Sequence, residues 1–355
     1  MYQNIAFEKS KNLLHIWDDE KGHFTMPYKK YAYRKNNNGK YVALDGTRVE
    51  KVYEWDDTDL QRGVIYESDI GPETRTLIDL YYESDDVSKG HREMYLDIEV
   101  ATEGGFSDTE EVWQPLTSIS FYDRAGDQYV AILVDPDNKV KSKVTNNLVL
   151  ESVKTERELM HKFLTHYASV APTIITGWNI EFFDIPYLYN RIRKVLGTKE
   201  ADRLSPINDV IWLKHRNRYK LQGVACLDYM ALYKNFTYSE ESSYSLEAIS
   251  QKELGKGKIQ YEGTLDHLYQ TDIDKFIEYN INDVRLVYEL DLKLQFLDQA
   301  RGVCHKGHVS YDDIYFTTRY LDGACLTYMK RLGIIAPNRK LRSAAPVDEN
   351  APLVF

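Results

Sequence analysis

The hexapeptide Tyr95–Val100 (YLDIEV) constrains the fold and the chemistry of this chain more than any other stretch. Leucine, isoleucine and valine alternate in it with tyrosine, aspartate and glutamate, which is the pattern of a β-strand buried on one face. Successive side chains of a strand point to opposite faces, so Asp97 and Glu99 share one face of this strand. Neighbouring carboxylates repel each other, and a divalent metal ion with oxygen ligands is the natural partner for both. A solvated strand edge is the alternative, because an Asp-x-Glu triplet is common by chance.

The segments after this strand predict a mixed α/β domain built around it. Apolar residues recur at helical or strand spacing in blocks that turn residues separate. Thr155 is a suitable N-cap for one helix, and Pro186 suits the first turn of another that would stop at Gly197. The first two of the expected strands would continue an antiparallel meander that begins with the acidic strand. The expected elements are strands at 116–122, 128–134, 172–178 and 224–228 and helices at 156–167, 186–196, 245–252, 273–297 and 315–332.

Residues 1–91 have a different pattern and predict a separate, β-rich α+β domain. Asn36–Gly39 is a strong turn signal, and we expect residues 40–44 to be the return strand of a hairpin with the tyrosine-bearing residues before the turn. Residues 72–82 have helical spacing. Exposed aromatic residues on a small β-barrel can bind single-stranded nucleic acid, but an ordinary meander with half-buried tyrosines is the simpler interpretation.

Length and composition limit the class of protein. A chain of 355 residues is long enough for two or three domains. It has no apolar run near the ~20 residues of a membrane span and no signal-peptide pattern, so we expect a cytoplasmic protein. Three widely spaced cysteines, Cys226, Cys304 and Cys325, are expected to be buried free thiols. The net charge of −10 argues against a basic, non-specific nucleic-acid binder, although basic residues cluster over 191–220 and could contact phosphates or form a solvated helix face.

Further polar residues lie where functional groups gather in α/β folds. Asp184 falls at the junction between the buried strand at 172–178 and the next helix, at the carboxyl end of the strand, where ligands bind in α/β sheets. Tyr279 and Asp283 are four residues apart on the long predicted helix and therefore share a face. Asp228 ends another strand, where it either supports the same site or caps the strand end. With the two acids of the first strand, these residues form a candidate metal-binding constellation.

Three segments of the chain resemble the three exonuclease motifs of the DEDD superfamily, tyrosine subtype. In order along the chain they are Asp97-Ile98-Glu99, Asn179 with Phe183-Asp184, and Tyr279-x-x-x-Asp283. The resemblance implies a ribonuclease H-like exonuclease domain over residues 92–295, in which a mixed sheet is flanked by helices. Their order and separation both fit this superfamily, which makes four unrelated surface acids a poor explanation.

The chain is similar, more closely still, to family B DNA polymerases of the T-even phage kind. The segments that carry this resemblance are Thr176–Glu181, Pro186-Tyr187, Asn190-Arg191, Gly257-Lys258 with Tyr261 and, near the N-terminus, Tyr66–Arg75. In such polymerases the segment after the exonuclease completes the N-terminal domain. Residues 296–355 are therefore expected to pack on residues 1–91 and to lead toward a palm domain. The palm motifs for nucleotide addition are not in the sequence, so we expect this chain to hydrolyse DNA but not to polymerise it.

The resemblance implies hydrolysis of the 3′-terminal phosphodiester of DNA with two divalent ions, Mg²⁺ or Mn²⁺, roughly 4 Å apart. Asp97 would bridge the two ions. Glu99 and Asp283 would hold the ion on the side of the attacking water, and Asp184 would serve the second ion, partly through water.

Four more residues take roles that the resemblance implies. Tyr279 would orient the attacking water, since a phenol with an ordinary pKa near ~10 is a poor base at neutral pH. Lys258 would lie near the scissile phosphate, with a solvated loop lysine as the alternative. Asn179 and Phe183 would contact the terminal nucleotide, although Phe183 fits a core position equally well.

A proofreading exonuclease of this kind would receive the single-stranded 3′ end of DNA from the palm, fingers and thumb of a full-length or split polymerase. Replication accessory proteins would be further partners, and a phage-encoded enzyme would act in the cytoplasm of a bacterial host. Two other interpretations remain open: an exonuclease that acts on RNA, and a non-catalytic module whose N-terminal tyrosines bind single strands. Turnover of DNA and RNA oligonucleotides in Mg²⁺, compared with binding in EDTA, separates the three.

Overall fold

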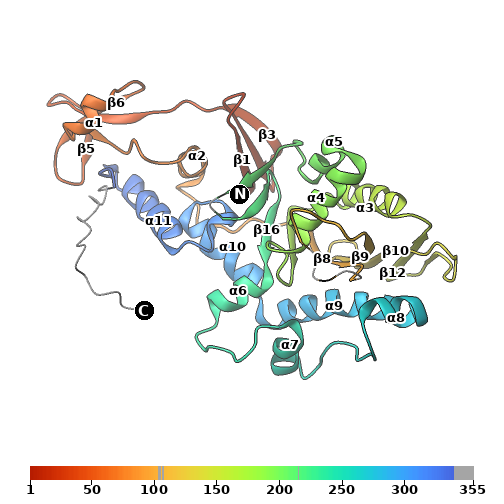
Figure 1. The fold of residues 1–355 in the computed structure, drawn as a ribbon. Helices are drawn as coiled ribbons and strands as arrows, with labels where there is room; N and C mark the ends of the chain where they lie inside the picture. The colour runs from red at the N-terminus through yellow and green to blue at the C-terminus, as the bar shows by residue number, and fades with distance from the viewer. Residues whose placement is uncertain (103–104, 106–107, 215, 340–355) are drawn as a thin grey trace, which may run out of the picture.

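The structure is a computed structural model that describes residues 1–102, 105, 108–214 and 216–339. The last part of the expected segment 296–355, beyond Arg339, lies outside the described residues. Figure 1 shows a β-rich N-terminal part beside a larger part in which helices surround a sheet. Among the described helices, none is long and apolar enough to cross a membrane.

A seven-stranded mixed sheet organises the larger part, in the order β11-β12-β10-β9-β8-β13-β16. Its strands are β8 (Glu93–Val100), β9 (Leu116–Asp123), β10 (Gln128–Val134), β11 (Lys143–Val144), β12 (Leu148–Val153), β13 (Ile174–Gly177) and β16 (Ala225–Asp228). β8, β9 and β10 form the predicted antiparallel meander, whereas β13 runs parallel to β8 and β16 runs parallel to β13. The acidic strand β8 therefore lies inside the sheet, which confirms the predicted α/β class.

Helices cover both faces of this sheet (Figure 1). α3 (Glu156–Val170) and α4 (Asp184–Leu196) pack on one face, and α9 (Ile273–Leu294) crosses β8, β9 and β10 on the other. Leu96 and Ile98 of β8 belong to the core beneath α3 and α4, whereas Tyr95 belongs to the core beneath α9. Because side chains alternate along the strand, the two acids of β8 face α9.

A hydrogen bond fixes how α9 lies along β8. The Tyr95 hydroxyl donates to Asp291 Oδ2 at 2.8 Å. Asp283 lies two helical turns before Asp291, about 12 Å along the helix axis. The four residues from Tyr95 to Glu99 extend about 13 Å along the strand. The helix therefore runs antiparallel to β8 and brings Asp283 over the acidic end of the strand.

The helix predicted over 273–297 is two helices in the structure. α9 ends at Leu294, and Gln295 adopts the left-handed conformation, with a φ of 55°. α10 (Phe296–Gly307) follows, and then come α11 (Thr317–Arg331) and β17 (Ile334–Ile335). No sequence signal marks this break, because Gln295 is neither glycine nor proline and apolar residues continue on both sides.

Two small sheets form most of the N-terminal part. The first contains β1 (Tyr2–Glu8), β2 (Leu13–Asp18) and β3 (Gly22–Pro27), all antiparallel. The second has the order β17-β5-β6-β4-β7, so a strand from near the C-terminus of the described chain completes it. Its other members are β4 (Ala32–Lys35), β5 (Tyr41–Ala43), β6 (Arg48–Val52) and β7 (Ile65–Tyr66), and the helices of this part are α1 (Asp57–Gln61) and α2 (Pro72–Tyr81).

The prediction of a hairpin across Asn36–Gly39 is wrong. β5 pairs with β6, and β4 pairs with β6 and β7, so the two expected partners are not neighbours. The tight turn is instead Asp45-Gly46, which joins β5 to β6. There the Thr47 amide donates to Asp45 Oδ1 at 2.9 Å, and Gly46 has a φ of +82°. This turn competes successfully because a glycine with positive φ matches the twist of a short hairpin.

The remaining helices and strands lie between α4 and α9 in the sequence. They are α5 (Thr198–Ala201), β14 (Val210–Leu213), β15 (Arg218–Leu221), α6 (Tyr229–Phe236), α7 (Leu246–Leu254) and α8 (Leu265–Thr271). Thr155 caps α3 as predicted, by accepting a hydrogen bond from the Glu158 amide at 3.2 Å. Cys226 and Cys304 are buried free thiols as expected, but Cys325 is exposed on α11.

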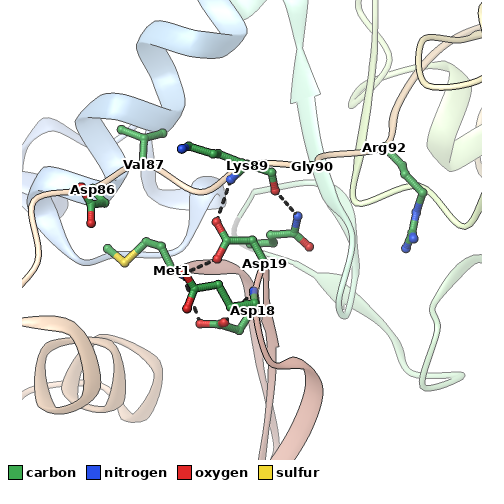
Figure 2. Close-up of a pocket in the computed structure, with 10 residues that line it drawn as sticks. Met1, Asp18, Asp19, Asp86, Val87, Lys89, Gly90 and Arg92 are labelled. Atoms are coloured by element: carbon green, nitrogen blue, oxygen red, sulfur yellow. Dashed lines mark hydrogen bonds and ion pairs between the residues drawn. The ribbon is translucent and has the colours of Figure 1, made fainter.

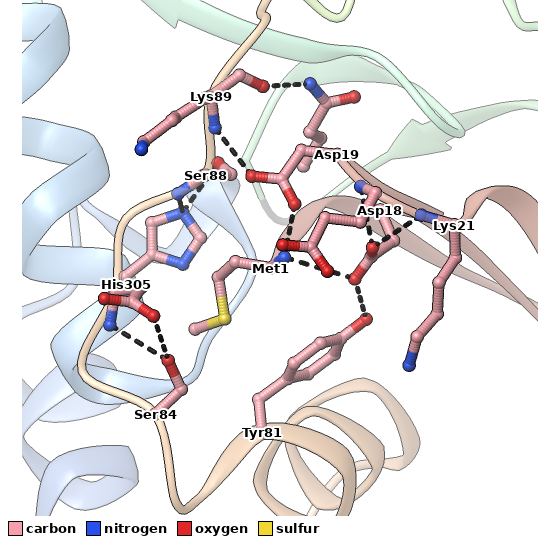
Figure 3. A network of polar contacts seen from close by, with 12 residues as sticks. Met1, Asp18, Asp19, Lys21, Tyr81, Ser84, Ser88, Lys89 and His305 are labelled. Carbon is pink, nitrogen blue, oxygen red and sulfur yellow. Dashed lines mark hydrogen bonds and ion pairs between the residues drawn. The ribbon is translucent and has the colours of Figure 1, made fainter.

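A polar network joins the first sheet to the segment that leads into β8 (Figure 3). Asp18 lies 3.4 Å from the N-terminal ammonium and accepts a hydrogen bond from the Tyr81 hydroxyl at 2.7 Å. Burial would raise the pKa of Asp18, but the amides of Lys21 and Glu20, the Tyr81 hydroxyl and the ammonium outweigh burial and hold this pKa at about 2. Asp18 is therefore ionised throughout the physiological range.

A cluster of histidine, serine and tyrosine side chains ties α10 to the same segment. Ser88 Oγ lies 2.9 Å from His305 Nε2 and 2.8 Å from His91 Nε2, and the Tyr311 hydroxyl lies 2.8 Å from His305 Nε2. Figure 3 shows the contact between Ser88 and His305. Burial lowers the pKa of both histidines to about 3, so both rings are neutral and serve as hydrogen-bonding groups.

Candidate metal centre

Three of the predicted acids meet on the face of the sheet that α9 covers. Asp97 and Glu99 of β8 and Asp283 of α9 each place a carboxylate oxygen within 4.8 Å of the other two. Burial and repulsion from the neighbouring carboxylates raise the pKa of Asp97, and they raise the pKa of Glu99 to about 8. Burial also raises the pKa of Asp283, although Lys258 opposes this effect. These shifts show that the fold concentrates negative charge here at a cost in free energy.

Two oxygens of this cluster indicate what it would hold. Asp97 Oδ2 and Asp283 Oδ1 are buried and have no hydrogen-bond partner among the described residues. A buried oxygen without a partner is costly, so such atoms are uncommon unless an ion or water completes them. Carboxylate oxygens are the preferred ligands of Mg²⁺ and Mn²⁺. The donor set and the two unpartnered oxygens therefore fit a divalent cation.

Asp184 reaches the same strand from the other side, at the first residue of α4. β13 pairs with β8 only as far as Tyr95, so the Ile98 amide lies beyond this pairing. Asp184 Oδ1 accepts a hydrogen bond from the Ile98 amide at 3.1 Å. Burial raises the pKa of Asp184 to about 7. Gly177 at the end of β13 is required for this close approach, because a Cβ atom there would lie 2.3 Å from the Leu96 carbonyl oxygen.

Asp228 supports the turn that delivers Asp184. Its carboxylate caps α6 by accepting from the Ala231 amide at 3.1 Å, and it also accepts from the amides of Asn179 at 3.3 Å and Glu181 at 3.2 Å. Asp228 was expected either to support the site or to cap a strand end. In the structure it supports the turn before Asp184 and also caps a helix, α6, not a strand end.

Asn179 and Phe183 flank this turn, close in sequence to Asp184. Asn179 is half-buried and has a φ of 67°, a left-handed conformation that asparagine tolerates better than most residues. Phe183 is half-buried against the core, and its ring stacks on Tyr187 with centroids 5.6 Å apart. Phe183 thus has core contacts and retains some exposed surface, and contact of either residue with a nucleotide remains an expectation.

Lys258 enters the acidic cluster directly. Its Nζ donates to Asp283 Oδ2 at 2.6 Å and to the Tyr279 hydroxyl at 3.0 Å. The interpretation of Lys258 as a solvated loop lysine is therefore wrong. Burial would lower the pKa of Lys258, but Asp283 and Tyr279 outweigh burial and raise it. Burial and the Asp283 charge raise the pKa of Tyr279, so its hydroxyl stays neutral at physiological pH.

Glu247 positions Lys258 and was not predicted. Its carboxylate accepts a hydrogen bond from the Lys258 amide and lies so close to Gly257 that a Cβ atom there would be 2.5 Å from Oε1. Asn282 Nδ2 donates to the Gly257 carbonyl at 3.3 Å, and the Tyr261 ring meets the Tyr279 ring edge-on at 5.4 Å. The only sequence signal for Glu247 was its place in the first turn of the helix predicted over 245–252.

Three of the basic residues between 191 and 220 are paired with acids and are therefore not free to bind phosphates. Arg191 lies 2.7 Å from Glu156, Lys220 lies 3.1 Å from Glu73, and Arg218 forms a buried ion pair with Glu181. These cations neutralise acids of neighbouring elements. Their clustering in the sequence therefore overstated how many of them could contact phosphates.

A cavity of about 730 Å³ lies at the junction of the first sheet and the segment before β8 (Figure 2). Met1, Asp18, Asp19, Lys89 and Arg92 line it, so both acidic and basic groups face this cavity. None of the clustered acids of β8, α4 or α9 is among its lining residues, so this cavity is separate from the candidate metal centre.

A mixed sheet with helices on both faces and with acids on a central strand, at a strand–helix junction and on a covering helix defines an exonuclease-type α/β domain. The family model for the DNA polymerase family B exonuclease domain matches residues 63–249, just over half of the chain, and the chain belongs to this family. The resemblance to T-even phage polymerases is thereby confirmed, as the relatives show.

Over 277 residues the chain is 29% identical to the DNA-directed DNA polymerase of Escherichia phage RB69, an alignment that covers 70% of this chain and 31% of that protein. Over 199 residues it is 30% identical to the DNA-directed DNA polymerase of Enterobacteria phage T4, which covers 54% and 22%. It is also 33% identical over 207 residues to DNA polymerase 1 of Sulfurisphaera ohwakuensis, which covers 55% and 22%. The matched region thus spans a third or less of the length of these relatives.

Proposed function

We propose that this chain is the 3′–5′ proofreading exonuclease portion of a replicative family B DNA polymerase and that it hydrolyses the 3′-terminal phosphodiester of DNA. The observation that carries the proposal is the cluster of Asp97, Glu99 and Asp283, which lie within 4.8 Å of one another and have two buried, unpartnered oxygens. Asp184 beside the same strand completes the four acids of the exonuclease motifs.

Asp97, Glu99, Asp184 and Asp283 are the residues that would hold two divalent ions, Mg²⁺ or Mn²⁺. Such ions make a bound water more acidic and stabilise negative charge on the leaving 3′ oxygen. Asp97 is the proposed shared ligand, because both Glu99 and Asp283 lie beside it and because it has an unpartnered oxygen of its own. Glu99 and Asp283 would hold the ion that makes the attacking water more acidic, and Asp184 would help to hold the second ion.

Tyr279, Lys258, Asn179 and Phe183 act on the substrate and the water. The Tyr279 hydroxyl orients the attacking water by hydrogen bonding and does not remove its proton, because its raised pKa keeps it neutral. The Lys258 ammonium neutralises charge on the scissile phosphate. Asn179 and Phe183, on the turn before α4, contact the terminal nucleotide and hold it in register with the acids.

We propose the domain boundaries 1–91, 92–295 and 296–355, with the last segment packed on the first domain. The parallel pairing of β17 with β5 and the break at Gln295 support this division. We further propose that these 355 residues alone do not add nucleotides, and that the single-stranded 3′ end reaches them from polymerase palm, fingers and thumb domains. Replication accessory proteins are proposed as further partners.

A time course with a 5′-labelled single-stranded DNA oligonucleotide tests the proposal. Wild-type protein in Mg²⁺ should give a ladder that shortens from the 3′ end, and EDTA or Asp97→Ala should abolish it. Asp137→Ala removes an acid that is largely exposed and should leave the ladder unchanged. Circular dichroism checks that each variant is folded. A folded wild-type protein that binds the oligonucleotide but never shortens it would favour a binding module, and faster cleavage of an RNA oligonucleotide would change the substrate.

A further inference from the structure

We infer that Lys258 competes with a divalent cation for the Asp283 carboxylate, so that metal binding releases the Lys258 ammonium into the site. The inference rests on the proposed function, because it takes the clustered acids to be metal ligands. It adds a second role for Lys258, as a built-in counter-ion of the cluster that metal displaces.

The contacts of Lys258 place its charge where a cation belongs. Its Nζ bonds to Asp283 Oδ2 at 2.6 Å, and the Asp283 side chain is only 3% exposed. Asp283 is also one of the three acids whose oxygens converge within 4.8 Å. The ammonium thus neutralises part of a buried acidic cluster that would otherwise be strongly self-repelling.

Formal charge explains why the ammonium would leave. When all four acids are ionised, they carry a formal charge of −4 that acts on the single positive charge of Lys258. One divalent ion reduces the charge that acts on the ammonium to −2, and a second reduces it to zero. The attraction that holds Nζ against Asp283 therefore weakens with the first ion, and the net attraction is lost with the second. In a partly buried site, where screening by water is weak, this loss acts on Nζ at short range.

The backbone around Lys258 is anchored independently of its ammonium. Glu247 accepts from the Lys258 amide, and Asn282 donates to the Gly257 carbonyl at 3.3 Å. Release of Nζ from Asp283 therefore needs only rotation of the flexible four-carbon side chain. The loop keeps the released ammonium next to the site, where a phosphate would be its next partner. Metal binding and phosphate contact would thus be linked through one side chain.

The chemical reactivity of Lys258 tests the release directly. The full chain is acetylated briefly in EDTA or in saturating Mn²⁺, without DNA, and the modification of each lysine is measured by mass spectrometry. We expect acetylation of Lys258 to rise at least threefold in Mn²⁺. Lys256 is the matched control, because it lies in the same loop and pairs with Glu289 at 2.7 Å, away from the acids, so its acetylation should not change.

Mn²⁺ affinity provides the second measurement. Loss of a competing unit charge should make Lys258→Met bind Mn²⁺ about tenfold more tightly than wild type, as read from the free-Mn²⁺ paramagnetic resonance signal, while Lys256→Met stays within twofold. Lys258→Met should nevertheless cleave DNA more slowly than wild type.

The outcomes separate this inference from the proposed function. If wild type binds Mn²⁺ and cleaves DNA but Lys258 acetylation does not change, the metal uses Asp283 Oδ1 beside an intact ion pair, and only the inference is overturned. If wild type binds no Mn²⁺, both are overturned. Tighter binding by Lys258→Met together with increased acetylation of Lys258 in the wild type supports the competition.

Discussion

Asp228→Ala should destabilise the protein and slow the exonuclease, although Asp228 is not one of the proposed metal ligands. One carboxylate accepts three backbone amides, those of Ala231, Asn179 and Glu181, at 3.1 to 3.3 Å. The first of these bonds caps α6, and the other two hold the turn that leads to Asp184. Alanine removes all three acceptors and leaves a space that is closed to solvent, since Asp228 is fully buried.

The expected loss of unfolding free energy follows from those three bonds. Removal of a helix N-cap costs about 1 kcal/mol. Each buried amide that loses its acceptor costs about 1–3 kcal/mol. Asn179 is only half-buried, so water can replace part of its bond, and burial already raises the pKa of Asp228 and offsets part of the benefit of its charge. The total is therefore about 3 kcal/mol.

Urea denaturation followed by circular dichroism measures this loss, with Thr155→Ala as the matched control. Thr155 caps α3 with one bond at 3.2 Å and does not contact the site, so its loss should cost about 1 kcal/mol and leave cleavage unchanged. Asp228→Asn keeps an oxygen acceptor and should fall between the two. If Asp228→Ala is no less stable than Thr155→Ala, the two turn amides do not depend on this carboxylate and the reasoning is refuted.

Three further predictions concern single groups. Tyr279→Phe should slow hydrolysis about tenfold, the effect of one hydrogen bond, and far less than Asp97→Ala does. The pKa of Asp18 is about 2 in the folded protein and 3.8 ordinarily, so its contribution is present above pH 4 and is lost as pH falls through 2. Asp18→Asn should therefore cost about 2 kcal/mol at pH 7 and less than about 1 kcal/mol at pH 2.5 in urea denaturation. Gly177→Ala should cost more than about 2 kcal/mol by the same assay, because its Cβ meets a backbone oxygen, whereas Gly302→Ala, inside α10 with open space around it, should stabilise by about 0.5–1 kcal/mol.

Each of these predictions has a result that contradicts it. Equal losses of rate in Tyr279→Phe and Asp97→Ala would mean that the tyrosine does more than orient water. A cost of Asp18→Asn that is the same at both pH values would show that the carboxylate is not ionised in the fold. A neutral Gly177→Ala would mean that β13 can move away from β8 without loss.

Much of the candidate site could be predicted from local sequence. The alternation in Tyr95–Val100 put Asp97 and Glu99 on one face, and the four-residue spacing put Tyr279 and Asp283 on one side of a helix, as the structure has them. These predictions succeed because side-chain direction in a strand or helix depends on backbone geometry over only a few residues.

Other predictions failed where local patterns allowed more than one outcome. The hairpin predicted across Asn36–Gly39 did not form, because the tighter Asp45-Gly46 turn pairs β5 with β6. The predicted long helix ends at Leu294, and a second helix begins at Phe296 without a glycine or proline to mark the change. In the first case two local turn signals competed, and in the second no local signal distinguished one helix from two.

The sequence by itself determined which residues are candidates for the chemistry and in which order they occur, because motif spacing and alternation are local properties. Only the tertiary structure decided that the Lys258 ammonium lies on Asp283, that Glu247 holds its backbone, and that one carboxylate at Asp228 serves both α6 and the turn before Asp184. The physical reason is that each of these contacts joins side chains or amides of separate elements. Their distances are set by how the helices pack on the sheet, which no local pattern encodes.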